Sequence, residues 1–438
     1  MRRAARGPGA LLMYETFART KSVCPVCLRT IDAEKAVAGD GFVHLIKTCP
    51  EHGFFDALIW EGGAEEYLAW GGAPAGGGAD DGCPNNCGLC AGHKSEGCCV
   101  LLELTHRCNL RCPVCFASAG GEGDLGLDEI ARLYDMLMAR GGPFNIQLSG
   151  GEPTMRDDLP EVVRLGRERG FTFFQLNTNG LRLASEAGYA EELREAGVSC
   201  AFLQFDGLRP ETYARLRGRD LAAEKLRAID SCAAAGLPVV LVPTLVPGVN
   251  VDEIGGILRF ALGRGKAVRG VHFQPVSYFG RCELPEPETR LTIPRVIREI
   301  EAQTGGAMKF ADFGGGAESP WCSFHASYRK LPGGGLKALP RRESACCCKK
   351  SSEARDFVAG RWGAEAGPAA EEDGFDRFLR EALENTFTVS GMAFMDADSL
   401  DLERLRRCYI CEADAERGMV PFCAYNLTAR DGRALYRK

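Results

Sequence analysis

The sequence predicts an α/β protein built around a partial (β/α)6 barrel, a TIM-like fold, with cysteine-rich regions on both sides. Apolar strand-like runs alternate with amphipathic helical segments between about residues 99 and 285, at intervals of roughly 25–40 residues. Strands joined by helices in this way run parallel, and the right-handed crossover rule curls them in one direction. Groups of cysteines lie before this alternation, directly after its first strand and again beyond its end.

Four regions follow from this pattern. Residues 13–60 contain two cysteine-rich corners and are expected to form a small zinc-ribbon or rubredoxin-like metal domain. Residues 61–98 form a Gly-rich connector with a cluster motif, residues 99–285 form the barrel, and residues 286–438 form a cysteine-bearing extension. In the barrel we expect strands at 100–104, 144–148, 171–176, 198–205, 239–245 and 268–273, and helices at 127–140, 159–169, 184–196, 222–235 and 251–262.

The C-terminal extension is patterned less regularly than the barrel. Helices are expected near residues 293–302, 371–386 and 400–406. Residues 331–369 are rich in Gly, Lys and Arg and are expected to form a loop.

Composition argues against several functional classes. The formal net charge of −6 provides no basic field for nucleic acid. No apolar run is long enough to span a membrane and the N-terminus shows no signal-peptide pattern, so we expect a cytoplasmic protein. Cysteine is the outlier with 21 residues, and most are too closely spaced for disulfide partners but suit a shared metal or cluster. We therefore expect reduced, metal-bound cysteines rather than a disulfide framework.

A CxxxCxxC motif follows the first predicted barrel strand, with Cys108, Cys112 and Cys115 as its thiols. Three thiolates at this spacing can bind three irons of a [4Fe–4S] cubane and leave the fourth iron without a protein ligand. An open metal position separates catalytic from structural sites. The alternative is a closed cluster whose fourth ligand lies elsewhere in the chain.

The next predicted strand ends in Gly150, Gly151 and Glu152, followed by a proline. The two glycines permit close backbone approach to a ligand, and Glu152 supplies a carboxylate. A CxxxCxxC motif followed by GGEP on six barrel units resembles the radical S-adenosylmethionine (SAM) superfamily. The resemblance implies that SAM chelates the open iron and that Gly150, Gly151 and Glu152 contact its methionyl amine. It also implies that one-electron cleavage of SAM gives a 5′-deoxyadenosyl radical, which removes hydrogen from the substrate.

Three further strand ends carry polar residues that fit this arrangement. Asn177 closes the third strand, Gln204 and Asp206 close the fourth, and Thr244 closes the fifth. Each could instead be a cap or turn residue, since Asn-Gly and Asp-Gly are ordinary turn formers. Gln274-Pro275, after the sixth strand, is a candidate for the substrate pocket. The expected site thus comprises Cys108, Cys112 and Cys115 as catalytic cluster ligands and Phe116, Gly150, Gly151, Glu152, Asn177, Gln204, Asp206 and Thr244 as cofactor contacts.

A second CxxxCxxC motif, formed by Cys83, Cys87 and Cys90, lies in the connector. It follows a Gly-rich segment instead of a strand, and no GGEP strand end follows it directly. We therefore assign it to an auxiliary [4Fe–4S] cluster, with Cys98 or Cys99 as the fourth ligand. A zinc site is the alternative.

Two short knuckles lie near the N-terminus: Cys24 with Cys27, and Cys49 with His52. The pattern looks like a zinc ribbon or a rubredoxin-like site. A set of three cysteines and one histidine suits zinc better than iron, and a structural role is expected. His44 is a less favoured alternative ligand.

The C-terminal extension carries the last cysteines. Cys408, Cys411 and Cys423 are the leading ligands of a second auxiliary cluster, with Cys322 as a possible fourth. The run of three cysteines at 346–348 lies in a charged loop and has no assignment. Isolated cysteines at positions 200, 232 and 282 are interpreted as buried small hydrophobes.

The order of these motifs, ending in PFCAYN, resembles the radical SAM group that includes archaeal tetraether lipid synthase and 7,8-dihydro-6-hydroxymethylpterin methyltransferase. The resemblance implies hydrogen abstraction from an unactivated carbon. We favour carbon–carbon bond formation on a lipid chain, with methyl transfer to a reduced pterin as the alternative. A narrow apolar channel that opens to the surface would favour the lipid, and a closed polar pocket would favour the pterin.

The resemblance also implies partners. These are SAM, a small-molecule or lipid substrate, and a reducing electron donor such as ferredoxin or flavodoxin, with peripheral membrane contact if the substrate is a lipid. Two non-enzymatic alternatives are a multi-cluster electron-transfer protein and a zinc-dependent binding protein. Neither of them needs the GGEP strand end or a six-unit barrel.

Overall fold

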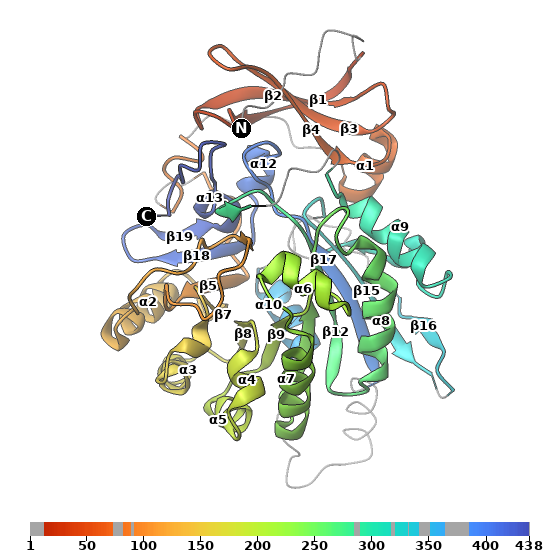
Figure 1. Ribbon diagram of the computed structural model, residues 1–438. Coiled ribbons are helices and arrows are strands. Elements are labelled where there is room, and N and C mark those ends of the chain that lie inside the picture. Colours follow the sequence, from red (N-terminus) through yellow and green to blue (C-terminus); the bar gives the residue numbers. More distant parts are fainter. Residues whose placement is uncertain are drawn as a thin grey trace.

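The computed structural model describes residues 13–72, 82–88, 92–283, 290–316, 320–331, 333–340, 351–363 and 385–437 of the 438-residue chain. Two β-sheets organise these residues: a small N-terminal sheet and a large sheet that forms the barrel (Figure 1). A short antiparallel pair, β6 (Val114–Cys115) and β13 (Arg281–Cys282), joins the loop after the first barrel strand to the segment after the last one.

The N-terminal sheet is an antiparallel meander in the order β1-β2-β3-β4. The turn after β1 carries Cys24 and Cys27, and the turn after β3 follows Cys49 and carries His52, so both knuckles lie at one end of the meander. The elements of this unit are β1 (Glu15–Val23), β2 (Thr30–Val37), β3 (Val43–Cys49), β4 (Gly53–Trp60) and helix α1 (Ala64–Gly71).

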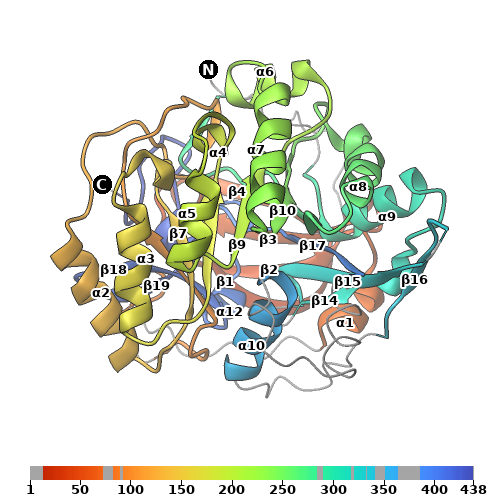
Figure 2. The same cartoon turned by 90° about the horizontal axis from the view of Figure 1, so that it is seen from below.

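The six predicted barrel strands are all present and run parallel, in the order β5-β7-β8-β9-β10-β12. Helices cover one face of this curled sheet in a row, which Figure 2 shows from below. The prediction of a partial α/β barrel is therefore confirmed. The strands are β5 (Cys99–Glu103), β7 (Asn145–Ser149), β8 (Phe174–Thr178), β9 (Cys200–Gln204), β10 (Val239–Val242) and β12 (Val268–Pro275), and the main covering helices are α2 (Leu127–Ala139), α3 (Leu159–Glu168), α5 (Tyr189–Ala196), α7 (Ala222–Ala235) and α8 (Ile254–Gly263).

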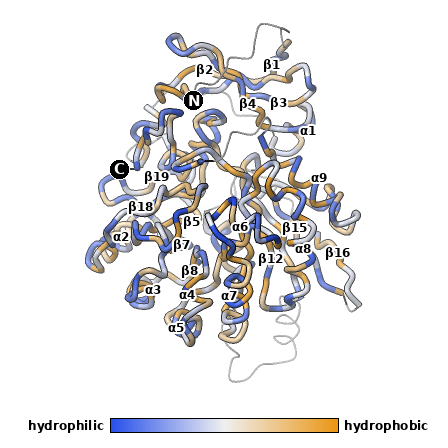
Figure 3. The backbone as a smooth tube through the Cα atoms, in the orientation of Figure 1, coloured by the Kyte–Doolittle hydropathy of each residue, from blue (hydrophilic) through white to orange (hydrophobic). Residues whose placement is uncertain are grey.

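Alternate residues of the barrel strands face two different environments. On β7, Ile146 and Leu148 are fully buried in the hydrophobic core, whereas Gln147 and Ser149 line a cavity inside the barrel. The covering helices mix hydrophobic and hydrophilic residues along their length, as expected for segments that bury one side (Figure 3). The barrel thus has an apolar outer layer and a partly polar interior.

The structure differs from the prediction between β8 and β12. The helix predicted at 184–196 is divided, because left-handed Gly188 (φ +82°) separates α4 (Leu181–Ser185) from α5. Helix α6 (Pro210–Arg217) was not predicted, although proline at its start and a left-handed glycine at its end are common helix signals. The strand predicted at 239–245 is interrupted at proline 243, which has no N–H for the ladder, and continues as β11 (Thr244–Leu245).

The C-terminal extension adds strands to both ends of the barrel sheet. On one side β17 (Thr386–Met392) pairs with β12 in parallel, and β15 (Ser323–Lys330) pairs with β17 in antiparallel orientation. On the other side β18 (Ile410–Asp414) runs parallel to β5. The helix predicted at 371–386 lies outside the described residues except for its last two, and the second of these begins β17. The remaining strands of the extension are β14 (Gly314–Gly315), β16 (Leu336–Ala338) and β19 (Gly418–Pro421).

Helix α10 (Ser351–Trp362) corrects the expectation of a loop over residues 331–369, of which 332, 341–350 and 364–369 lie outside the described part. Its backbone accepts a hydrogen bond from the Asn145 amide at the start of β7 (2.9 Å), and Arg355 donates to carbonyls of Gly141 (2.8 Å) and Pro143 (2.9 Å). These partners all precede or begin β7. Helix α10 therefore lies at the N-terminal end of the barrel strands, opposite the cysteine loop.

The other helical segments are short or peripheral. The helix expected near 293–302 is present as α9, and the one near 400–406 as α12. In the described part of the chain, no helix has both the length and the apolar composition needed to cross a membrane. These remaining segments are α9 (Ile293–Gln303), α12 (Leu402–Leu405), α13 (Phe422–Tyr425) and three 3-10 turns at Pro153–Met155, Val251–Glu253 and Phe310–Asp312.

A buried polar interface attaches the N-terminal sheet to the C-terminal extension. Lys35 on β2 forms an ion pair with Asp401 (2.7 Å), and the two side chains are only 2% and 1% exposed. Thr20 donates to the same carboxylate (2.7 Å), and Lys47 donates to the Ala397 carbonyl (2.8 Å). Because a buried charge is costly without its partner, these contacts fix how the two units sit together.

Replacing Lys35 with methionine leaves the Asp401 carboxylate buried without its counter-ion. We expect Lys35→Met to lower the free energy of unfolding by about 3–5 kcal/mol. As a matched control, Lys21→Met breaks an ion pair with Asp32, whose side chain is 92% exposed. This control should lower the free energy of unfolding by less than about 1 kcal/mol. Urea denaturation followed by tryptophan fluorescence measures both values, and equal costs would contradict a buried-pair role for Lys35.

Candidate active site and metal centres

A cavity of about 300 Å³ occupies the inside of the barrel. Cys108, Cys112 and Cys115 lie on its wall, in the loop between β5 and α2. Burial, together with the nearby Glu152 and the neighbouring cysteines, raises the pKa of the Cys108 thiol to about 12. A metal cluster must therefore displace protons when it binds here. Three clustered thiols that face an open cavity fit a cubane with one free corner.

The cysteine loop packs against the glycines that follow β7. Gly150 has a φ of +124°, and a Cβ atom there would lie 2.4 Å from the Thr105 carbonyl oxygen. A Cβ atom on Gly151 would lie 2.2 Å from the Arg107 carbonyl oxygen. The sequence predicted that the glycines allow close approach to a ligand. Both line the cavity, but the close contact that requires glycine is with the backbone of the cysteine loop.

Glu152 is held in one orientation by four hydrogen bonds. Its Oε1 accepts from the Thr154 backbone N–H (3.1 Å) and hydroxyl (2.7 Å) and from the Thr178 hydroxyl (2.7 Å). Its Oε2 accepts from the Asn179 backbone N–H (2.7 Å). The carboxylate is 2% exposed and lines the cavity. Glu152 therefore connects the ends of β7 and β8, and Oε2 is the oxygen that can accept a further hydrogen bond from a ligand.

Asn177 belongs to a row of amides on the cavity wall. The Gln175 amide donates to Asn177 Oδ1 (2.7 Å), and Asn177 Nδ2 donates to Gln147 Oε1 (3.2 Å). All three side chains line the cavity, from β7 and β8. Each amide both donates and accepts, so this row can match a ligand edge that alternates donors and acceptors.

The polar residues after β9 are organised by Arg217, at the end of α6. Arg217 pairs with both carboxylate oxygens of Asp206 (2.7 Å each) and donates to the Thr244 hydroxyl (2.9 Å). The Gln204 amide oxygen, oriented toward Arg217, accepts from its guanidinium at 2.8–3.0 Å. Gln204, Thr244 and Arg217 line the cavity, whereas Asp206 is fully buried behind them. Asp206 therefore supports the wall and is not part of it.

Arg217 is the functional residue that sequence reasoning missed. Its guanidinium lies beside the Cys112 thiol and also donates to the Val114 carbonyl (3.2 Å). Burial raises the pKa of Cys112, and the positive charge of Arg217 opposes this rise. The available signal was the helix punctuation around α6, which brings this arginine back to the strand ends.

The other predicted contacts of the barrel are also found on the cavity wall. Phe116 lines it and packs against Phe422 at a ring distance of 5.4 Å. Gln274 and Pro275, at the end of β12, line it as well. The C-terminal extension therefore completes a wall that the barrel alone would leave open.

The end of the cavity near α10 contains an uncharged histidine. His272 on β12 shares a hydrogen bond of 2.8 Å with the Ser390 hydroxyl on β17. Burial lowers the pKa of His272 to about 4, so the imidazole is neutral at physiological pH.

The N-terminal knuckles come together as predicted. The ligand atoms of Cys24, Cys27, Cys49 and His52 all lie within 4.8 Å of one another. His52 Nδ1 is 3.5 Å from the Cys24 sulfur and 3.4 Å from the Cys49 sulfur. This arrangement fits a tetrahedral zinc ion. His44 is directed elsewhere and pairs with two aspartates of the same sheet.

The connector motif is only partly described, because Cys90 lies outside the described residues. Cys83 and Cys87 are buried on the wall of a second, small cavity. Cys98 and Cys99 are buried in the same hydrophobic cluster, with their sulfurs 3.6 Å apart. Cys99 also lines the barrel cavity. The four described thiols are therefore buried in one hydrophobic cluster, and Cys99 connects this cluster to the barrel wall.

The C-terminal cysteines gather around Arg404. Arg404 donates to the Cys322 sulfur (3.1 Å), and the Met395 backbone N–H donates to the Cys423 sulfur (3.3 Å). Burial, together with the nearby Cys322, raises the pKa of Cys408 to about 12. Cys411 lies between Cys408 and Cys99, and burial raises its pKa as well. Residues 346–348 lie outside the described part.

Removing one knuckle ligand should empty the zinc site. We expect Cys27→Ser to lower zinc from about one ion per chain to near zero, because a structural site needs all four ligands. Cys232→Ser, which changes a buried thiol on α7, is the matched control and should keep its zinc. Elemental analysis of the purified proteins measures the difference, and full zinc content in Cys27→Ser would reject this ligand set.

His272 should make the protein less stable in acid. Its folded pKa of about 4 lies below the ordinary value of 6.5, so protonation favours the unfolded chain. The contribution of neutral His272 to the free energy of unfolding is complete above the unfolded pKa and is lost as the pH falls toward the folded pKa. Between about pH 7.5 and about pH 5 we expect the free energy of unfolding to fall by about 2 kcal/mol in the parent protein, a loss that His272→Gln does not show.

The matched control is His106→Gln, at an exposed position, which should keep the pH dependence of the parent protein. Urea denaturation across this pH range, with metal content checked at each pH, distinguishes the variants. An unchanged pH profile in His272→Gln would show that His272 is not buried in its neutral form.

Two family models match parts of the chain. The radical SAM superfamily model matches residues 102–261. A model described as the HMPTM N-terminal zinc ribbon domain matches residues 16–61, the unit that carries both knuckles.

Curated relatives match over longer stretches. The chain is 42% identical over 308 residues to 7,8-dihydro-6-hydroxymethylpterin dimethyltransferase from Methanocaldococcus jannaschii, covering 67% of this chain and 60% of that protein. It is 35% identical over 185 residues to GTP 3′,8-cyclase 2 from Mycobacterium tuberculosis, covering 41% of this chain and 51% of that protein. The matches thus span between about half and three-fifths of these relatives. Among solved structures, Streptococcus suis SuiB bound to S-adenosylmethionine aligns with a TM-score of 0.41 at 14% identity, over 48% of this chain and 47% of that chain.

The region matched by the first model begins inside β5 and ends in α8, so it includes the cysteine loop, the glycines after β7 and the wall around Arg217. These are the same parts that the cavity brings together. The chain therefore belongs to the radical SAM superfamily.

Proposed function

We propose that this radical SAM enzyme transfers a methyl group to a carbon atom of a reduced pterin. The proposal is supported by the 42% identity to a pterin dimethyltransferase and by a cavity whose wall combines amides with aromatic rings. The sequence alone favoured a lipid chain. The amides of Gln175 and Asn177 bond one another and still have hydrogen-bonding capacity toward the cavity, which a pterin ring can use and an alkyl chain cannot. The pterin is therefore the better-supported substrate.

The cysteine loop fits the group that the superfamily implies. A [4Fe–4S] cluster on Cys108, Cys112 and Cys115, with SAM at its open iron, would supply the carbon-centred radical that removes hydrogen from the substrate. The chain holds this loop rigid: Gly151 N–H donates to the Thr105 carbonyl (2.7 Å), and Glu152 N–H donates to the Arg107 carbonyl (2.8 Å). A rigid loop keeps the reacting atoms in register, which is the main contribution of a protein to cofactor chemistry.

The wall around Arg217 is suited to orient a bound cofactor. Because Arg217 donates to the oxygen atoms of Gln204 and Thr244, both side chains are held in one orientation on this part of the cavity wall. The guanidinium also places a permanent positive charge next to Cys112, which favours thiolates and anionic groups there.

The remaining cysteines support electron transfer to this site. We assign Cys83, Cys87 and Cys90, with Cys98 or Cys99, to one auxiliary cluster, and Cys322, Cys408 and Cys423, with Cys411, to a second. Cys99 and Cys411 belong to adjacent strands β5 and β18, so the two groups approach each other at the barrel wall. A reductant such as ferredoxin or flavodoxin would deliver electrons through them.

Anaerobic assays test this function. The reconstituted protein with dithionite and SAM should release 5′-deoxyadenosine, and Cys112→Ala should lower that release to background because the cluster loses a ligand. Cys232→Ala is the matched control and should keep its activity within about twofold, since this thiol lies outside the cavity. Addition of 7,8-dihydro-6-hydroxymethylpterin, together with a one-carbon donor, should give a methylated pterin detectable by mass spectrometry. If SAM is cleaved but no methylated pterin is formed, the substrate assignment is rejected.

A further inference from the structure

We infer that helix α10 is the floor of the substrate site. Its Trp362, together with Phe202 of β9, selects a planar heteroaromatic ring, and its Arg361 binds the polar edge of that ring. The inference rests on the proposed pterin function, because it assigns the substrate of that site to one end of the cavity. No residue of α10 was expected from the sequence to have a role, since the whole segment was predicted to be a loop.

One face of α10 closes the cavity. Phe357, Val358, Arg361 and Trp362 line it, and their spacing of one, three and four residues places them on the same side of the helix. The opposite side, including Glu353 and Asp356, is exposed to solvent. Because α10 lies at the N-terminal end of the strands, this face looks along the barrel toward the cysteine loop.

Aromatic rings form one part of this floor. Trp362 is 7% exposed and meets Phe202 of β9 edge to face, with ring centroids 5.7 Å apart and planes at 86°. Gly270 of β12 makes room for the indole, because a Cβ atom there would lie 2.9 Å from the Trp362 ring. Two rings at a right angle form a corner that a flat aromatic ligand can fill by stacking on one ring and contacting the edge of the other.

Polar groups surround this corner. The Arg361 guanidinium lies 4.3 Å above the Phe357 ring and donates to hydroxyls of Ser327 and Thr388, which fixes its position at the cavity wall. His272 packs near Phe202 at 5.8 Å, and the amides of Gln175 and Asn177 follow on β8. A ring whose edge carries carbonyl, amino and ring-nitrogen groups can add hydrogen bonds to these donors and acceptors, whereas an alkyl chain cannot.

The two ends of the cavity therefore have separate tasks. The cysteine loop, Glu152 and Arg217 lie at the strand ends where SAM is expected, and α10 lies at the opposite end. Changes on α10 should therefore weaken substrate binding. A residue that only stabilises the fold would instead lower the unfolding midpoint without a specific effect on pterin affinity.

Binding to the anaerobically reconstituted holoenzyme tests the inference. We expect Trp362→Leu to raise the Kd for 7,8-dihydro-6-hydroxymethylpterin about tenfold through lost stacking, and Arg361→Gln to raise it between about tenfold and a hundredfold through a lost charge-assisted hydrogen bond. Trp362→Phe keeps an aromatic ring and should retain most of the affinity. The iron content and the thermal unfolding midpoint of all three variants, compared with those of the parent protein, serve as the fold control.

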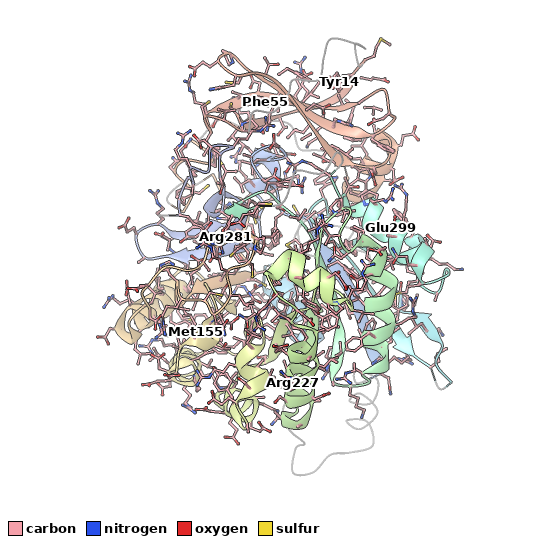
Figure 4. The ribbon with its side chains drawn as sticks, viewed as in Figure 1. Tyr14, Phe55, Met155, Arg227, Arg281 and Glu299 are labelled. Atoms are coloured by element: carbon pink, nitrogen blue, oxygen red, sulfur yellow. The ribbon has the colours of Figure 1, made fainter. Side chains whose placement is uncertain are left out.

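Arg227→Gln is the matched control for the charge, because Arg227 is exposed on α7 on the outside of the barrel (Figure 4). It should leave the Kd unchanged. Parental pterin affinity in both Trp362→Leu and Arg361→Gln would overturn the inference while the proposed function stands.

A parallel titration with GTP separates the two claims. If the parent protein binds GTP but not the pterin, and Trp362→Leu weakens GTP binding, the floor is supported and the proposed substrate is rejected. If the parent protein binds neither ring, the inference is overturned.

Discussion

The structure depends on a backbone contact that only glycine permits. The carbonyl groups of Thr105 and Arg107 occupy the space in which a side chain at Gly150 or Gly151 would lie, at 2.2–2.4 Å from an added Cβ atom. This contact joins the loop that carries the three cysteines to the end of the neighbouring strand. It sets where the thiols face the cavity and places Glu152 directly behind them. Any residue larger than glycine would push the cysteine loop away from the cavity wall.

Arginines from three distant segments hold the rest of the same loop. Arg217 donates to the Val114 carbonyl (3.2 Å), Arg281 donates to the carbonyls of Cys112 (2.8 Å) and Ala119 (3.2–3.3 Å), and Arg437 donates to the Ala117 carbonyl (3.4 Å). Figure 4 labels Arg281 at the boundary between the barrel and the C-terminal elements. Each bond satisfies a backbone acceptor in the segment between β5 and α2, in which the short strand β6 is the only regular element described. The loop is therefore fixed by the folding of the whole chain, including residues near its C-terminus.

The sequence predicted the parts of the fold that repeat and missed those that depend on tertiary contacts. Alternation of apolar strands and amphipathic helices located all six barrel strands, and cysteine spacing located the knuckles that meet around His52. Arg217 was missed because its role arises only when α6 folds back and pairs it with Asp206. Helix α10 was missed because its segment is compositionally loop-like and its stability comes from contacts such as those of Arg355 with carbonyls before β7.

The same reasoning explains why a structural zinc unit is attached to a redox enzyme. Lys35 of the N-terminal sheet pairs with Asp401, whose carboxylate also caps the first turn of α12 through the Glu403 N–H (3.0 Å). Helix α12 carries Arg404, which donates to the Cys322 sulfur. Hydrogen bonds and positive charge at a sulfur ligand tune the potential of a cluster and the orientation of its ligands. Through this chain of buried contacts, the zinc-stabilised sheet fixes the helix that presents a cation to the C-terminal thiols, so its folding is coupled to the electrostatic environment of those thiols although it contributes none of them.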